Sequence, residues 1–183
     1  AWSALKLSDA TQARVRALGV RFFLDGAAVA VAGASGSADR VFVEGITQDS
    51  TASGVDGLVS WITERWRKYG AVVIDGKSGA CFLLQKLAKK GVPARVAFSP
   101  TAAEFITAHT TFLDAVKSGR LAHSDQPGLN AAVSSATQHL TARGWWWEPI
   151  GDGDTLLLEA ATLALWGAEV KAKPTAAPPR RIY

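Results

Sequence analysis

Three aspartates stand where an apolar run ends or begins. Asp25 follows a strand-like run directly, Asp75 ends the run AVVI, and Asp154 precedes a long apolar helical stretch. Sites in open α/β sheets form at the carboxyl ends of strands. Carboxylates that meet there bind hard cations such as Mg²⁺ or Mn²⁺, and two ions about 4 Å apart can clamp a phosphodiester and activate a water. The three aspartates are therefore candidate catalytic metal ligands.

Each aspartate also has a structural interpretation. Asp25-Gly26 is typical of a hairpin turn, and Asp154 suits the N-cap of a helix, where its carboxylate accepts backbone N–H bonds. Asp75 is the hardest to explain in this way, because a carboxylate that ends a wholly apolar strand must lie at the edge of the core. Both interpretations stay open.

Lys77 is a candidate contact to a phosphate backbone. Lys77 lies in a Gly-Lys-Ser triplet, but the first glycine of a phosphate-binding loop would fall at Ala71, inside a strand. We therefore reject a nucleotide-binding loop. Lys77 can equally be a solvated surface charge. The run Trp145-Trp146-Trp147 predicts either core packing or base stacking, with the first and third rings on one face of a strand.

The hydrophobic pattern predicts an α/β fold. Strands over 18–23, 27–34 and 41–47 read as an antiparallel meander. A helix over 55–69, a strand over 71–74, a helix over 78–90 and a strand over 94–98 follow, and they make a parallel βαβ unit. The remaining expected elements are helices over 101–118 and 127–141, a strand over 143–148 and a helix over 154–166.

Length and composition indicate one domain. The chain has 183 residues, a net charge of +4 and one cysteine, Cys81, which we expect to be buried. Disulfides are excluded, and no apolar run approaches the roughly 18 residues of a membrane span. A polyanionic partner is compatible with the charge. We expect a linker remnant over 1–16, a folded domain over 17–168 and a flexible basic tail over 169–183.

Three segments, AVVIDGKSGA, LAHSDQPGLNAAV and GDGDTLLLEAATLALWGA, resemble the nuclease domain of large terminase subunits from tailed phages, most of all phages of actinobacteria. The resemblance covers most of 17–168. It implies a ribonuclease H-like mixed sheet, with a three-stranded antiparallel meander, parallel strands and flanking helices. It also implies a divalent-metal-dependent endodeoxyribonuclease with Mg²⁺ or Mn²⁺, two ions in all, that cuts concatemeric viral DNA during packaging in the host cytoplasm. The implied partners are double-stranded DNA, the terminase ATPase domain, the small terminase subunit and the portal. Lys77 and Arg143 are then candidate contacts to the phosphates of the DNA.

The resemblance assigns the acids as Asp75 and Asp154, with Asp152 as a rival to the second. The family has an aspartate within the first strand, and the matching residue here is Arg21. Asp25 is the nearest carboxylate that could supply the third ligand. The exchange at Arg21 favours an alternative, a DNA-binding or docking module of the terminase whose catalysis is weak or lost. Another ribonuclease H-like nuclease, such as a junction resolvase, is a further alternative, although the run DTLLLEAATLALWG favours a terminase.

Overall fold

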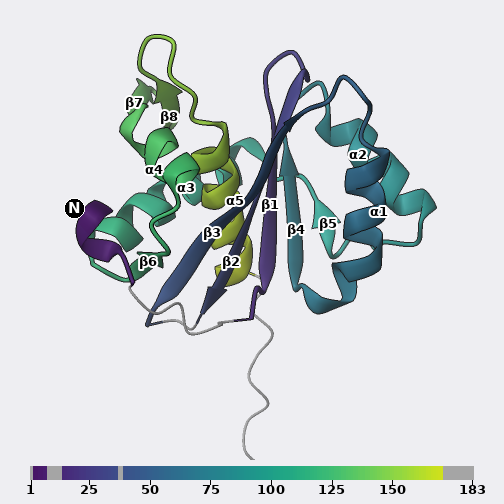
Figure 1. The fold of residues 1–183 in the computed structure, drawn as a ribbon, viewed down its shortest axis with the longest axis horizontal. Coiled ribbons are helices and arrows are strands. Elements are labelled where there is room, and N and C mark those ends of the chain that lie inside the picture. Colours follow the sequence, from purple (N-terminus) through teal and green to yellow (C-terminus); the bar gives the residue numbers. More distant parts are fainter. Residues whose placement is uncertain (1, 8–13, 37–38, 171–183) are drawn as a thin grey trace, which may run out of the picture.

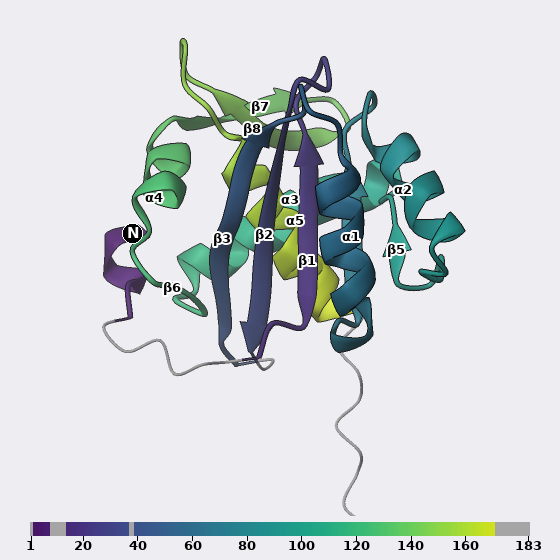
Figure 2. The same cartoon turned by 45° about the vertical axis from the view of Figure 1, so that its right-hand side comes forward.

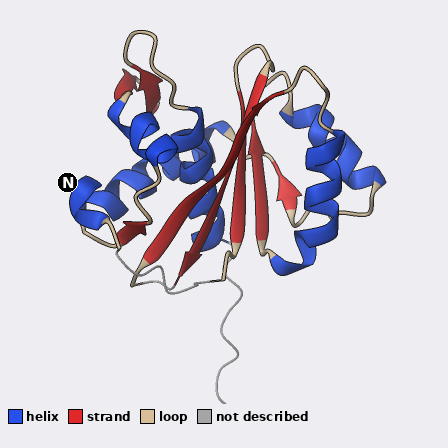
Figure 3. Ribbon diagram, in the orientation of Figure 1, coloured by secondary structure: helices blue, strands red, loops and turns tan. Residues whose placement is uncertain are grey.

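The computed structural model describes residues 2–7, 14–36 and 39–170. A six-stranded sheet with the strand order β5-β4-β1-β2-β3-β6 forms its centre, and a two-stranded hairpin, β7–β8, lies apart from that sheet (Figure 3). The elements are η1 (Trp2–Leu5), β1 (Ala17–Phe22), β2 (Ala28–Gly36), β3 (Val41–Ser50), α1 (Asp56–Arg65), η2 (Trp66–Lys68), β4 (Ala71–Asp75), α2 (Ala80–Lys89), β5 (Ala97–Phe98), α3 (Ala102–Lys117), β6 (Leu121–His123), α4 (Pro127–Ser134), β7 (Ala136–Thr141), β8 (Gly144–Pro149) and α5 (Leu156–Val170).

The sheet is mixed, as the sequence predicts. Strands β1, β2 and β3 form an antiparallel meander. β4 pairs in parallel with β1, and β5 pairs in parallel with β4. On the other edge, the short strand β6 pairs in parallel with β3. The carboxyl ends of β1 and β4 therefore lie side by side near the middle of the sheet.

Helices cover both faces of the sheet. Helices α1 and α2 lie on one face, and α3, α4 and α5 lie on the other (Figures 1 and 2). The alternation of side chains along β1 explains how one strand serves both layers. Leu18, Val20 and Phe22 join the apolar cluster beneath α1 and α2. Ala17 packs with Trp166 of α5 on the opposite face, and Arg21 points to that same face.

Helix α5 is the central helix of the fold. All of its residues from Leu156 to Gly167 are buried, including one acid, Glu159. This burial explains why its sequence is apolar on every side, a pattern typical of a core helix rather than a surface helix. Within the described ranges, no helix is long and apolar enough to cross a membrane.

Two sequence-based element predictions are wrong. The helix predicted over 127–141 ends at Ser134, and residues 136–141 form β7, which pairs with β8. The strand β6 was not predicted. Trp147 packs against the apolar cluster that includes α5 and donates its indole N–H to Thr162 at 2.9 Å. All three tryptophans are only half-buried, so the base-stacking interpretation stays a prediction. Trp146 instead contacts His139 on the neighbouring strand.

The N-terminal residues pack on the edge of the sheet. The Trp2 ring stacks on the His123 ring with centroids 3.9 Å apart, and its indole donates to Asn130 at 2.7 Å. Lys6 forms a parallel bridge with His123. Part of the segment expected as a linker thus contacts the domain. Of the expected tail, residues 169 and 170 belong to α5, and residues 171–183 lie outside the described residues.

Candidate active site at the carboxyl ends of β1 and β4

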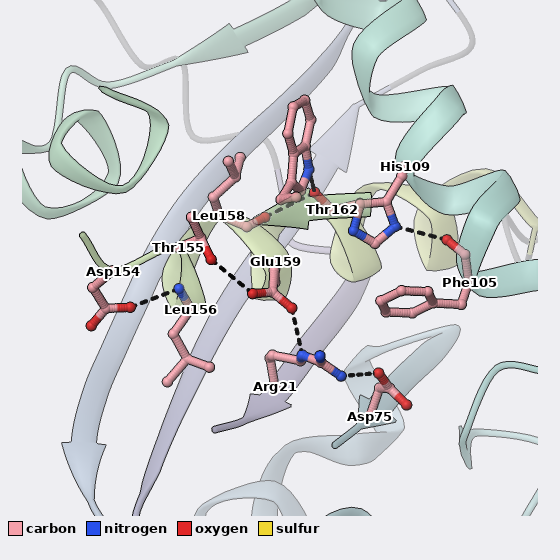
Figure 4. Close-up of polar contacts among 11 residues, drawn as sticks. Arg21, Asp75, Phe105, His109, Asp154, Thr155, Leu156, Leu158, Glu159 and Thr162 are labelled. Atoms are coloured by element: carbon pink, nitrogen blue, oxygen red, sulfur yellow. Dashed lines mark hydrogen bonds and ion pairs between the residues drawn. The ribbon is translucent and has the colours of Figure 1, made fainter. Parts of the chain in front are cut away.

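An arginine and an aspartate face each other at the ends of two neighbouring strands. Arg21 and Asp75 are direct partners in the parallel register of β1 and β4. The Nη1 group of Arg21 donates a hydrogen bond to Oδ2 of Asp75, within an ion pair (Figure 4). The position at which the first-strand acid was expected therefore carries a cation bound to the acid of the next strand.

A second acid, Glu159, reaches the same arginine from α5. The Nε group of Arg21 donates to Oε2 of Glu159 at 2.6 Å. This contact depends on a close approach of β1 to α5 at Gly19. A Cβ atom on Gly19 would lie 1.9 Å from the backbone oxygen of Ala160, so only glycine lets the helix lie this near. Arg21 thus bridges two carboxylates that come from a strand and a helix.

The bridge is largely withdrawn from solvent. The side chains of Arg21, Asp75 and Glu159 are 15%, 26% and 11% exposed. Burial raises the pKa of Glu159, and the positive charge of Arg21 opposes that rise. The second oxygen of Glu159 accepts a hydrogen bond from Thr155 at 2.9 Å. The guanidinium also lies 5.3 Å from the centre of the Phe105 ring, in cation–π geometry.

Sequence reasoning missed Glu159. Glu159 is the one acid in the buried part of α5, residues 156–167, and it needs a cation because an unpaired buried carboxylate is costly. Arg21 is the matching single cation in an otherwise apolar strand. The two charges were therefore a detectable signal, since each explains the presence of the other.

Asp154 lies at the start of α5 and is exposed. Its Oδ1 accepts a hydrogen bond from the backbone N–H of Leu156 at 2.8 Å, and its Oδ2 accepts one from the side-chain amide of Gln48. The carbonyl of Thr155 accepts the first hydrogen bond of α5, from the N–H of Glu159, so Thr155 is the N-cap. Asp154 lies one residue earlier than expected and forms an Asx turn. Asp152, its sequence rival, is exposed in the preceding turn. The assignment of Asp154 as a metal ligand stays a prediction.

The other predicted site residues are exposed. Asp25 lies in the β1–β2 turn, where its Oδ1 accepts from the backbone N–H of Ala27 at 2.8 Å. Lys77 lies in the loop between β4 and α2, two residues after Asp75, and Arg143 lies in the turn between β7 and β8. Their roles as a metal ligand and as DNA contacts stay predictions.

Solved structures share this arrangement of elements, whereas no family model and no curated protein matches the chain. The large terminase nuclease of the thermophilic phage G20c aligns with a TM-score of 0.63 and 13% identity, over 82% of this chain and 80% of that one. The chain has the ribonuclease H-like fold of the large terminase nucleases. The nuclease domain of Thermus phage P74-26 aligns with a TM-score of 0.58 and 13% identity, over 82% and 77% of the two chains. The HK97 large terminase aligns with a TM-score of 0.59 and 14% identity, but the alignment covers only 39% of that chain.

The terminase nuclease of G20c has been solved with bound magnesium and with bound cobalt. The residues of this chain do not fit such ions. Within the parts of the chain that the structure describes, no three His, Cys, Asp or Glu side chains come together as a metal site. Asp75 and Glu159 both contact Arg21, which binds one oxygen of each, and Thr155 binds the remaining oxygen of Glu159. A divalent ion at this place would meet a fixed positive charge.

Proposed function

We propose that this chain is the nuclease-fold domain of a phage large terminase and that it acts as a DNA-docking module of the packaging machinery. The fold supports the terminase assignment. We favour DNA docking over DNA cleavage because the guanidinium of Arg21 binds Asp75 and Glu159, the carboxylates that a catalytic metal ion would need. The ATPase domain, the small subunit and the portal are the proposed protein partners, and the host cytoplasm is the proposed place of action.

Double-stranded DNA is the proposed ligand, and the distribution of charge supports it. Residues 54–99 carry eight of the 20 lysines and arginines of the chain but only three of its 16 acids. This segment builds α1 and α2, which lie together on one face of the sheet (Figure 1). Its exposed cations are Arg67, Lys68, Lys77, Lys89, Lys90 and Arg95. Contacts from such residues to phosphates give affinity without sequence specificity.

Binding to a short fluorescent duplex at several salt concentrations tests this proposal. We expect affinity to fall steeply with salt, because each phosphate contact adds about −0.9 to the slope of log affinity against log salt. Lys77→Ala and Arg143→Ala should each reduce the slope by about one unit if the residue touches phosphate. Lys117→Ala, at the exposed end of α3 and outside the basic segment, is the matched control. Absence of duplex binding at low salt would refute the docking function.

A second candidate function is the metal-dependent endonuclease, with Asp75, Asp154 and Asp25 as the catalytic acids. The bound magnesium in the G20c nuclease and the position of Asp75 at the end of β4 favour it. In this candidate, Arg21 has to release both carboxylates before the domain becomes active.

Nicking of supercoiled plasmid decides between the two functions. The wild type is incubated with Mg²⁺, with Mn²⁺ and with EDTA, and Asp75→Asn is treated in parallel. The docking function predicts equal, background nicking in every tube. Nicking that requires a divalent ion and falls by at least about a hundredfold in Asp75→Asn would establish the endonuclease instead.

A further inference from the structure

We infer that the guanidinium of Arg21 is a built-in cation that replaces a metal ion, and that this one residue keeps a latent divalent-metal site closed. The inference deepens the proposed function, on which it rests for the role of the site. Its evidence is the set of contacts around Arg21, and its test measures metal binding and stability rather than DNA.

Charge balance is the first argument. Asp75 and Glu159 bring two negative charges to a place where both side chains are mostly buried. Two buried carboxylates around one place repel each other, and burying their charges is costly unless a cation pairs with them. Arg21 supplies that cation through two separate nitrogen atoms, one for each acid. The neutralisation that an ion would provide is thus already present in the chain.

Fixed geometry is the second argument. The register of β1 and β4 places Arg21 opposite Asp75, and the close packing of β1 on α5 at Gly19 places Glu159 beside it. The ring of Phe105 lies against the guanidinium and helps to hold it. A side chain restrained by two ion pairs and an aromatic ring is costly to displace, because the buried acids would lose their partner.

The chemistry of an exchange at position 21 follows from this geometry. Arg21→Asp removes the cation and adds a third carboxylate to the same place, between a strand acid and a helix acid. Three carboxylates without a cation form an oxygen-rich, strongly negative site of the kind that hard divalent ions prefer. The variant should therefore bind Mn²⁺, whereas the wild type should not.

Thermal unfolding of the purified chain with and without 10 mM Mn²⁺ tests the inference. For the wild type we expect no significant change in melting temperature. For Arg21→Asp we expect a lower melting temperature in EDTA and a rise of about 5–10 °C with Mn²⁺, the shift produced by a ligand at a hundredfold excess over its Kd in a domain of this size. Arg21→Asp combined with Asp75→Asn should lose the rise. Calorimetric titration with Mn²⁺ measures the same binding directly.

A stabilisation of the wild type by Mn²⁺ that Asp75→Asn abolishes would overturn the inference, and so would a folded Arg21→Asp variant that gains no stabilisation. A second set of variants covers the case in which Arg21→Asp does not fold. Because Arg21 neutralises Glu159, removing both charges should be milder than removing the cation alone. Arg21→Gln with Glu159→Gln should therefore melt at a higher temperature than Arg21→Gln. Equal or lower melting of the double variant would also refute the inference.

None of these readouts depends on DNA. If the chain does not bind duplex DNA, the docking function is refuted, but the inference of a closed metal site still stands. If Mn²⁺ stabilises the wild type, the inference of a closed metal site is refuted, but the proposal of DNA binding is unaffected.

Discussion

The side-chain amide of Gln126 forms hydrogen bonds with both the N–H and the C=O group of Gly45. Its Oε1 accepts a hydrogen bond from the Gly45 N–H at 2.7 Å, and its Nε2 donates one to the Gly45 carbonyl at 2.9 Å. The last residue pair between β3 and β6 is Val43 with His123, so the edge of β3 has no strand partner at Gly45 within the described residues. The amide of Gln126 therefore continues the ladder beyond the end of β6.

Gln126→Ala should destabilise the domain. It leaves the two backbone groups of Gly45 without their partner, and we expect a loss of about 1–3 kcal/mol in the free energy of unfolding. Urea denaturation measures the loss. Gln138→Ala, on the exposed side of β7, serves as the control and should change stability by less than about 0.5 kcal/mol. Equal stabilities of the two variants would show that the amide contributes nothing.

Gly19→Ala should be among the most damaging single-methyl changes in the chain. The added Cβ would lie 1.9 Å from the Ala160 oxygen and 2.5 Å from the Ala164 nitrogen, both backbone atoms of α5 that cannot move independently. We expect a loss of about 3 kcal/mol or more, measured by denaturation. Gly57→Ala is the matched control, because a Cβ there meets nothing within 4 Å and lies in α1, where alanine favours the helix by up to about 1 kcal/mol. A stable Gly19→Ala variant would contradict the close packing of β1 on α5.

His109 should make the domain less stable in mild acid. Its Nδ1–H donates to the Phe105 carbonyl at 2.8 Å, and burial lowers its pKa from 6.5 to about 4. The unfolded chain then binds a proton more readily than the folded one, so the contribution is complete above pH 6.5 and is lost as the pH falls toward 4. At about 1.4 kcal/mol for each pH unit, the loss is about 2–3 kcal/mol.

The test compares the wild type with His109→Gln, whose neutral amide can donate to the same carbonyl. Urea denaturation at pH 7.5 and at pH 4.5 gives the stability difference between the two proteins at each pH. We expect that difference to shift by about 2–3 kcal/mol against the wild type at the lower pH. The same difference at both pH values would mean that His109 does not titrate below its ordinary range.

Asp154 should contribute to stability through the Asx turn that precedes α5, whatever its role with metals. Asp154→Ala removes the acceptor of the Leu156 N–H, and we expect a loss of about 1 kcal/mol, the net contribution of one hydrogen bond. Asp154→Asn keeps an oxygen at the same place and should lose less. Asp152→Ala is the control, since Asp152 is exposed two residues earlier. If Asp154→Ala unfolds at the same urea concentration as the wild type, the hydrogen bond of this turn does not contribute to stability.

The strands β1 to β5 were predictable from their local sequence patterns, whereas the three-residue strand β6 was not. The apolar runs of β1, β2 and β4 are bounded by turn residues, and the helical periods of α1 and α3 are clear. The helix prediction for 127–141 is wrong in its second half. Apolar residues at 129, 132, 133 and 136 continue a helical period past Ser134, where α4 ends. Residues 136–141 form a strand because they pair with β8, and such pairing cannot be seen in the local sequence pattern. Cys81 is exposed, contrary to expectation, because α2 buries the face of Ala80, Leu83 and Leu87.

The candidate site was predictable only in part. Asp75 followed from an acid at the end of a buried strand, and the structure places it at that end beside Arg21. The partner Glu159 could not be found from spacing, because 138 residues separate it from Arg21. Only the packing of α5 across β1 brings the two together. Asp25 and Asp154 had local explanations, a turn and a helix cap. In the structure each accepts a hydrogen bond from the backbone N–H two residues on, which is a turn contact in both cases, and the cap of α5 is Thr155.

The place of α5 has a consequence for how the chain folds during synthesis. This helix is the last element of the described fold, yet it packs against β1, the first strand of the sheet. Contacts between such distant parts of a sequence slow folding, because a long loop has to close before they form. Until residues 156–167 leave the ribosome, one face of the β1–β3 meander stays exposed to solvent. The unpacked helix is itself apolar enough to aggregate. We therefore expect nascent chains that stop short of α5 to depend on chaperones, and the full domain to form in one late step.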